Sequence, residues 1–203
     1  MTSFATLRGF VLKPQARTPE AGEHCDLCGS IVAHQHQHLI DPAARKLMCT
    51  CDACAVLFSQ RGETKYKRVP RRARFLQDFA MSDAQWDSLL IPIGLAFFLK
   101  SSTEGRVLAM YPGAAGSAES LLSLDTWTDI VQDNPVLDQM ESDVEALLVN
   151  RLNGTAEYYL TPIDKCYELV GLIRSHWHGL SGGSELWQKI GDFFSALKEA
   201  ARA

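Results

Sequence analysis

The spacing of hydrophobic and polar residues predicts an α+β fold. Ser82 and, three positions later, Gln85 form a capping box that marks the start of a short helix. The apolar, β-prone segments 91–101 and 106–111 flank four turn-forming residues, so we predict a β-hairpin. Residues 112–117 are rich in glycine and alanine and lack the lysine and threonine of a phosphate-binding loop. We expect them to form a flexible loop.

Helical patterns dominate after residue 134. Pro135 fits the first turn of a helix, and apolar residues recur at helical spacing as far as Leu152, before Asn153 and Gly154 end the helix. We therefore expect a small antiparallel sheet packed with helices, two or three of them at the end of the chain. The other predicted elements are a strand at 157–160 and helices at 162–177 and 184–201.

Composition divides the chain into four parts. Residues 1–23 form an N-terminal lead with one apolar patch, and residues 24–60 hold five of the six cysteines. Residues 61–81 are a basic connector, and residues 82–203 form the α+β domain. In a cytosolic chain of 203 residues, clustered cysteines indicate a metal site before they indicate disulfides.

Two CxxC pairs make residues 24–60 a predicted metal-binding module. Cys25 and Cys28 precede a glycine that permits the tight turn of a zinc knuckle, and Cys51 and Cys54 repeat the spacing after 22 intervening residues. Two such pairs are typical of tetrahedral zinc, so we predict a treble-clef or zinc-ribbon-like module with structural zinc. An iron–sulfur cluster also takes four thiolates and is the alternative. Apolar residues follow the second pair, which we expect to begin a short helix packed on the core.

Further donor side chains lie near the two pairs. Cys49 can replace Cys51 as a ligand, and His36 and His38 alternate, so in a strand they point the same way. A site of three cysteines with His38, or a second metal shared with Cys49, is therefore an alternative to four cysteines around one ion. The sequence leaves open which of Cys49 and Cys51 binds the metal.

Charge is unevenly distributed along the chain. The formal net charge of −4 gives no general indication of nucleic-acid binding, so we expect a protein partner instead. Basic residues are concentrated between residues 61 and 74 while the remainder is acidic, which suggests two surfaces with different partners. The candidate partner-binding residues are Arg68, Arg71, Arg72 and Trp177.

No apolar run reaches the roughly 20 residues needed to cross a bilayer, and the N-terminus lacks the pattern of a secretory signal. We therefore expect no membrane span and a cytoplasmic location. Cys166 lies among apolar residues, as a buried thiol does. No catalytic triad, dinucleotide-binding fingerprint or carboxylate pair stands out. These patterns favour a protein that is not an enzyme.

The segment around the two cysteine pairs contains a CxxC pair, then His-Gln-His-Leu-Ile-Asp-Pro from His36 to Pro42, then a second CxxC pair. In this it resembles the treble-clef layout of the HNH nucleases. The resemblance implies a histidine general base, with His36 and His38 as the matching residues, and a catalytic divalent ion. The asparagine before the second pair and the closing histidine of that layout are missing. A shared zinc-supporting architecture is the favoured meaning, and an HNH-like nucleic-acid-binding protein is the second alternative function.

Four motifs span most of the chain: CDLCG, HQHLIDP, CTCDAC and PIDKCYELVGLIRSHWHGLSGG. With these motifs, residues 20–200 resemble an uncharacterised bacterial family encoded in gene clusters of high-affinity nickel–iron uptake hydrogenases. The resemblance implies a non-enzymatic accessory or maturation role, with a hydrogenase subunit as the partner. The first alternative is a protein that handles an iron–sulfur cluster, nickel or iron.

Overall fold

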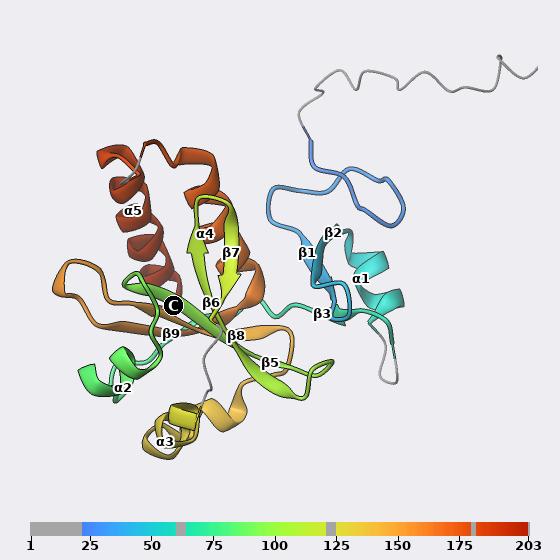
Figure 1. Cartoon of the computed structure of the whole chain (residues 1–203). Coiled ribbons are helices and arrows are strands. Elements are labelled where there is room, and N and C mark those ends of the chain that lie inside the picture. Colours follow the sequence, from blue (N-terminus) through green and yellow to red (C-terminus); the bar gives the residue numbers. More distant parts are fainter. Residues whose placement is uncertain (1–21, 60–63, 121–124, 180–181, 203) are drawn as a thin grey trace, which may run out of the picture.

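Two antiparallel sheets organise the computed structural model of the chain, which describes residues 22–59, 64–120, 125–179 and 182–202 (Figure 1). The predicted apolar patch of the N-terminal lead falls within residues 1–21, outside the described residues. The mixed α+β class predicted from the sequence is confirmed. Among the described residues, no helix combines the length and apolar character needed to span a membrane.

The smaller sheet belongs to the cysteine-rich module. Its strands are β1 (Gln37–Asp41), β2 (Lys46–Thr50) and β3 (Lys67–Arg68), in the order β2-β1-β3. Helix α1 (Asp52–Phe58) follows β2 after a single residue. A hairpin followed at once by a helix is the core of a treble clef, so the module has the predicted treble-clef-like form.

The larger sheet has six strands in the order β4-β9-β8-β5-β6-β7. Strands β5 and β6 form the hairpin predicted from the sequence, and Phe97 pairs with Met110 within it. Strands β8 and β5 lie at the centre, and β9 is also paired on both sides, by β4 and β8. The strands are β4 (Arg74–Phe75), β5 (Leu95–Ser101), β6 (Arg106–Gly113), β7 (Gly116–Glu119), β8 (Glu145–Asn150) and β9 (Glu157–Pro162).

Helices cover both faces of this sheet (Figure 1). On one face, Leu95 and Phe97 pack with α4 (Ile163–His176) and α5 (Ser184–Ala200). On the other face, the ring of Phe98 stacks on the ring of Trp127 in α3, with 5.3 Å between the ring centroids. The second face is covered by α2 (Asp83–Ser88), α3 (Asp125–Asp133) and the 3₁₀ helix η2 (Pro135–Gln139). Burial on both faces explains why β5 is apolar at successive positions.

The helix predicted to run from Pro135 to Leu152 is wrong. The chain forms only the short helix η2, turns at Asp143 with φ of 72°, and continues as the central strand β8. Residues 146–149 of β8 are fully buried because helices cover both sheet faces. A run in which every residue is apolar contains helical spacings by default, so periodicity alone cannot distinguish the two structures.

The flexible loop predicted for residues 112–117 is also wrong. Strand β6 continues to Gly113, which pairs with Gly116 at the start of β7. Only two alanines connect the strands, and Gly116 adopts a φ of 122° that favours glycine. The small residues therefore permit a tight hairpin at this edge of the sheet. The capping box at Ser82 and the two C-terminal helices are present as predicted.

The predicted basic connector, residues 61–81, contributes a strand to each sheet. Its β3 pairs with β1 of the small sheet, and its β4 pairs with β9 of the large sheet. Between these strands Val69 is buried in the main core. Pairing and burial on both sides fix the path of this segment between the two sheets.

An ion pair between the buried Asp143 and the partly exposed Lys67 joins the module to the α+β domain. The carboxylate of Asp143 accepts a hydrogen bond from Lys67 Nζ at 2.5 Å, and the backbone N–H of Ser102 donates to it at 2.8 Å. Burial raises the pKa of the Asp143 carboxyl, but the bonds from Lys67 and Ser102 outweigh this effect and hold the pKa below its ordinary value. The ionised carboxylate therefore stabilises the contact between β3 and the large sheet.

We predict that Asp143→Asn lowers the free energy of unfolding by about 1.5–3 kcal/mol at neutral pH, since hydrogen bonds to a buried charge are lost. Asparagine tolerates the positive φ, so the backbone is kept. Because the folded pKa is lowered, the contribution of Asp143 is complete above its ordinary pKa and lost as the pH falls through the folded pKa. Urea unfolding from pH 7 to pH 3 should therefore show the two proteins converging.

The matched control is Asp138→Asn, which makes the same change at an exposed position. It should alter the free energy of unfolding by less than about 0.5 kcal/mol. A deficit of Asp143→Asn that persists unchanged at low pH would contradict the role assigned to the ionised carboxylate.

Candidate metal centre

The first cysteine pair lies in a tight knuckle. The backbone N–H of Gly29 donates to the carbonyl of Cys25 at 2.8 Å, and Gly29 has a φ of 75°, which favours glycine. The N–H of Cys25 in turn donates to the carbonyl of Ser30 at 2.8 Å. These bonds close the loop and bring the Cys25 and Cys28 side chains to one side, as the CxxCG motif predicts.

The second pair lies at the start of α1. Cys51 is the N-cap, and its Sγ accepts a hydrogen bond from the backbone N–H of Cys54 at 3.5 Å. Cys54 is the third residue of the first turn, so the helical geometry places both sulfurs at the N-terminus of the helix. The partial positive charge at this end of a helix favours thiolates.

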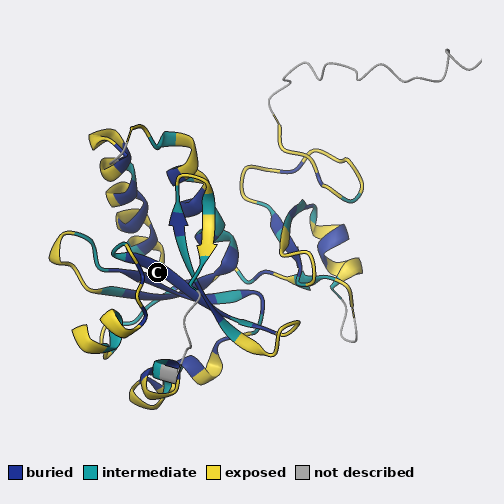
Figure 2. Cartoon of the chain, viewed as in Figure 1, coloured by how far each residue is buried: buried dark blue, intermediate teal, exposed yellow. Residues whose placement is uncertain are grey.

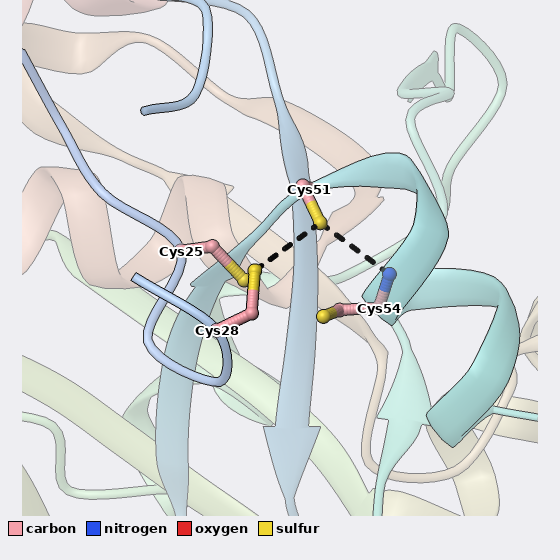
Figure 3. Close-up of side chains that lie close together, drawn as sticks. All are labelled: Cys25, Cys28, Cys51 and Cys54. Atoms are coloured by element: carbon pink, nitrogen blue, oxygen red, sulfur yellow. Dashed lines mark hydrogen bonds between the residues drawn. The ribbon is translucent and has the colours of Figure 1, made fainter. Parts of the chain in front are cut away.

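The four sulfurs converge from the knuckle and from α1 (Figure 3). The Sγ atoms of Cys25, Cys28, Cys51 and Cys54 all lie within 4.8 Å of one another, and those of Cys28 and Cys51 are 3.8 Å apart. One tetrahedral zinc ion with four Zn–S bonds of about 2.3 Å would separate its sulfurs by about 3.8 Å. The cluster therefore fits a single ion without rearrangement of the backbone.

Local hydrogen bonds favour thiolates at two exposed or half-buried positions. The Ser30 side chain lowers the pKa of Cys28, and the N–H of Cys54 lowers the pKa of Cys51. Burial opposes this at Cys25, where N–H groups of the knuckle and of Cys51 still leave the pKa below its ordinary value. At Cys54 burial raises the pKa to about 12, so this thiol depends on a cation for its ionisation.

The three additional donors form a group of their own. One ring nitrogen each from His36 and His38 and the Sγ of Cys49 lie within 4.8 Å of one another. The structure thus places Cys51 with the four-cysteine cluster and Cys49 with the two histidines. Asp26 links the groups, because its Oδ2 accepts from the N–H of Cys49 at 2.7 Å.

One contact between the module and the α+β domain could not be predicted from the sequence. Asp164 of α4 accepts a hydrogen bond from His38 Nδ1 at 2.7 Å although 126 residues separate them. Only the position of Asp164 in the first turn of a predicted helix hinted that it has a role.

The prediction that α1 packs its apolar residues on the core is wrong, because Val56, Leu57 and Phe58 are 55%, 64% and 44% exposed.

Of the candidate partner-binding residues, Arg68 lies on β3 beside the histidine-bearing strand β1. Arg68, Arg71 and Arg72 are exposed, and Arg68 donates to the side chain of Gln37 at 3.1 Å. Trp177 is half-buried against the main core, and its indole N–H donates to the carbonyl of Gly179 at 3.0 Å. Cys166 is fully buried in that core, where burial raises the pKa of its thiol, as expected for an inert side chain.

Comparison with known proteins assigns a family but no activity. Residues 24–201 match the family described as "Family of unknown function (DUF5947)". This match covers most of the chain, which therefore belongs to that family. Comparisons with curated proteins and with solved structures gave no significant match.

We predict that Cys51→Ser abolishes stable metal binding by the four-cysteine cluster. Serine keeps an acceptor at the helix N-cap but removes a thiolate ligand, so the loss is chemical and the cap remains. Metal content measured by mass spectrometry of the native protein should fall by one ion per chain. Amide exchange of residues 24–58 should accelerate, because metal binding and folding of a small module are coupled.

Cys166→Ala is the control, since it removes a thiol outside the cluster. It should retain the full metal content and lose only a modest amount of stability. Equal metal content in wild type and Cys51→Ser would show that the cluster does not hold the ion.

Proposed function

We propose that this member of the DUF5947 family is a non-enzymatic accessory or maturation protein for a nickel–iron hydrogenase, stabilised by structural zinc. The nature of the partner comes from the resemblance of the motifs described above. The structure supports the proposal with an exposed apolar surface on α1 that suits a protein partner. The proposal places the protein in the cytoplasm.

Zinc is the ion that the four-cysteine cluster supports best. Zinc is redox-silent, and in proteins it takes four thiolates in tetrahedral geometry. Thiolates of a multi-iron cluster bind different iron atoms, which separates their sulfurs further than the ligands of one ion. The mutual approach of all four sulfurs to within 4.8 Å therefore favours a single ion over the iron–sulfur alternative.

A structural role follows from the small apolar core around the cysteines. The buried residues of this cluster are Cys25, Val32 and Cys54, with Leu27 and Cys51 packed against them. Such a cluster buries too little apolar surface to order a knuckle and a helix by itself. Bonds from one ion to four thiolates supply the stabilisation that the small apolar core does not provide.

The observation that carries the proposal is the apolar surface of α1. The consecutive residues Val56, Leu57 and Phe58 are all exposed on a helix whose first turn provides two cysteines of the cluster. Consecutive residues point to different sides of a helix, so these side chains make most of the outer circumference of this turn apolar. Large apolar side chains concentrated at one exposed place favour a protein-binding site. Zinc would fix the orientation of this helix and thereby present the surface in a defined position.

The HNH-like alternative has weaker support. A general base must reach the proton that it removes, whereas the side chain of His36 is only 6% exposed. His38 is engaged by Asp164 through Nδ1. The second group of donors instead suits a metal.

We predict that Leu57→Ser abolishes binding to a hydrogenase subunit while the metal content and melting temperature stay within error of wild type. Leu57 is 64% exposed, so the change removes apolar surface without opening a cavity. Binding of the purified protein to the isolated hydrogenase large subunit, in its precursor and mature forms, and to the small subunit would be measured by biolayer interferometry.

Leu90→Ser is the matched control, because Leu90 is 68% exposed and lies in the α+β domain. It should bind like wild type. The proposal fails if wild type binds none of these subunits, or if Leu57→Ser and Leu90→Ser bind equally well.

A further inference from the structure

The pairing of β1 with β2 creates a second cluster of metal-ligating side chains beside the four cysteines. His38 and Cys49 are direct partners across the two strands, so their side chains lie on the same face. His36 precedes β1 and joins them, with its ring centroid 4.7 Å from that of His38. One donor atom from each of the three residues lies within 4.8 Å of the others.

His36 offers a buried nitrogen, Nε2, that has no hydrogen-bond partner among the described residues. Its Nδ1 lies 2.8 Å from the carbonyl oxygen of Ala33 and 3.4 Å from a carboxylate oxygen of Glu23. Both neighbours are acceptors, so they favour the tautomer with the proton on Nδ1 and the lone pair on Nε2. The whole side chain is only 6% exposed. Buried ring nitrogens are normally satisfied, and a metal ion is a partner that suits this lone pair.

His38 is arranged as metal-binding histidines usually are. Its Nδ1 lies 2.7 Å from Oδ2 of Asp164, which leaves the lone pair of Nε2 free for a metal. A carboxylate behind a ligating histidine fixes the ring orientation and makes the other nitrogen a stronger donor. Among the described residues, the second oxygen of Asp164, Oδ1, is buried and has no hydrogen-bond partner, so His38 is the one side chain bonded to this carboxylate there.

We propose that His36, His38 and Cys49 form a second metal site, distinct from the four-cysteine cluster, for a divalent transition ion such as zinc or nickel. Two imidazoles and one thiolate suit ions of borderline softness and do not suit magnesium or calcium. Three protein ligands leave a coordination position open, as in sites that exchange their ion or bind a further molecule. The site does not depend on the hydrogenase partner proposed above.

The position of Asp164 gives this site a structural consequence. Asp164 belongs to α4 of the α+β domain, whereas the three ligands belong to the module. A metal on His38 strengthens its bond to Asp164, because the ring N–H becomes a better donor. Occupancy of the second site is thereby coupled to the contact between the module and the α+β domain.

The test uses the full chain loaded with one equivalent of zinc and titrated without oxygen with Co²⁺, while released zinc is measured with a chromophoric indicator. We expect one further equivalent of Co²⁺ to bind without zinc release and to produce a near-ultraviolet charge-transfer band from a thiolate. The proposal is overturned if Co²⁺ binds only as zinc leaves.

Variants assign the band to individual residues. Cys49→Ser should lose the band, and His36→Gln and His38→Gln, made separately, should each weaken Co²⁺ binding at least about tenfold. The matched control is His34→Gln, because His34 is exposed on the same segment. Retention of the band in Cys49→Ser, or equal weakening by His34→Gln and His36→Gln, would overturn the assignment.

Asp164→Asn tests the positioning residue. It should weaken Co²⁺ binding about 10- to 100-fold and keep the charge-transfer band at saturation, since all three ligands remain. The four-cysteine zinc should be unchanged. Unchanged Co²⁺ affinity in Asp164→Asn would remove Asp164 from the site. Because these readouts follow Cys49 and the histidines, they remain informative if the proposed zinc or hydrogenase partner proves wrong.

Discussion

The cysteine-rich module has almost no apolar core around its knuckle, and this constraint governs the rest of the structure. Cys25, Val32 and Cys54 are the buried residues of that cluster, so the sulfurs themselves occupy the place of a core. In small modules with so little core, bonds to a metal ion supply stability that burial does not, and the arrangement of the four sulfurs is compatible with such an ion. The exposed apolar residues of α1 are compatible with this, because metal bonds at the first turn can hold a helix whose outer face is not packed.

The module is not an independent appendage, because polar contacts fix it to the α+β domain. Lys67 of β3 donates a hydrogen bond to Asp143, and His38 of β1 donates one to Asp164. Ile40 of β1 is also buried in the main core. Charged groups in partly buried contacts require matched partners, so these pairs restrict the position of the module more than apolar packing alone does. Figure 2 shows that most strands of the large sheet are buried, apart from the edge strand β7, whereas exposed residues of the module lie mainly in its loops and α1.

The two donor groups suggest a division of roles within one small module. Four thiolates around one ion form a closed set, whereas two imidazoles and a thiolate leave a position free. Asp26, next to Cys25 of the four-cysteine cluster, accepts a hydrogen bond from the N–H of Cys49, so the two groups are direct neighbours. A structural ion beside an exchangeable one would suit a protein that assists another metalloprotein.

Local features could be predicted from the sequence alone, because they depend on neighbouring residues. They are the CxxC knuckles, the capping box at Ser82 and the β5–β6 hairpin. That residues 145–150 form a central strand emerges from the packing of the whole chain, because burial on two faces erases the periodicity that separates strand from helix. The tertiary structure also decided the division of ligands: β1–β2 register places Cys49 opposite His38. Asp164 and His38 are 126 residues apart in the sequence, and no local sequence pattern predicts a contact between residues so far apart.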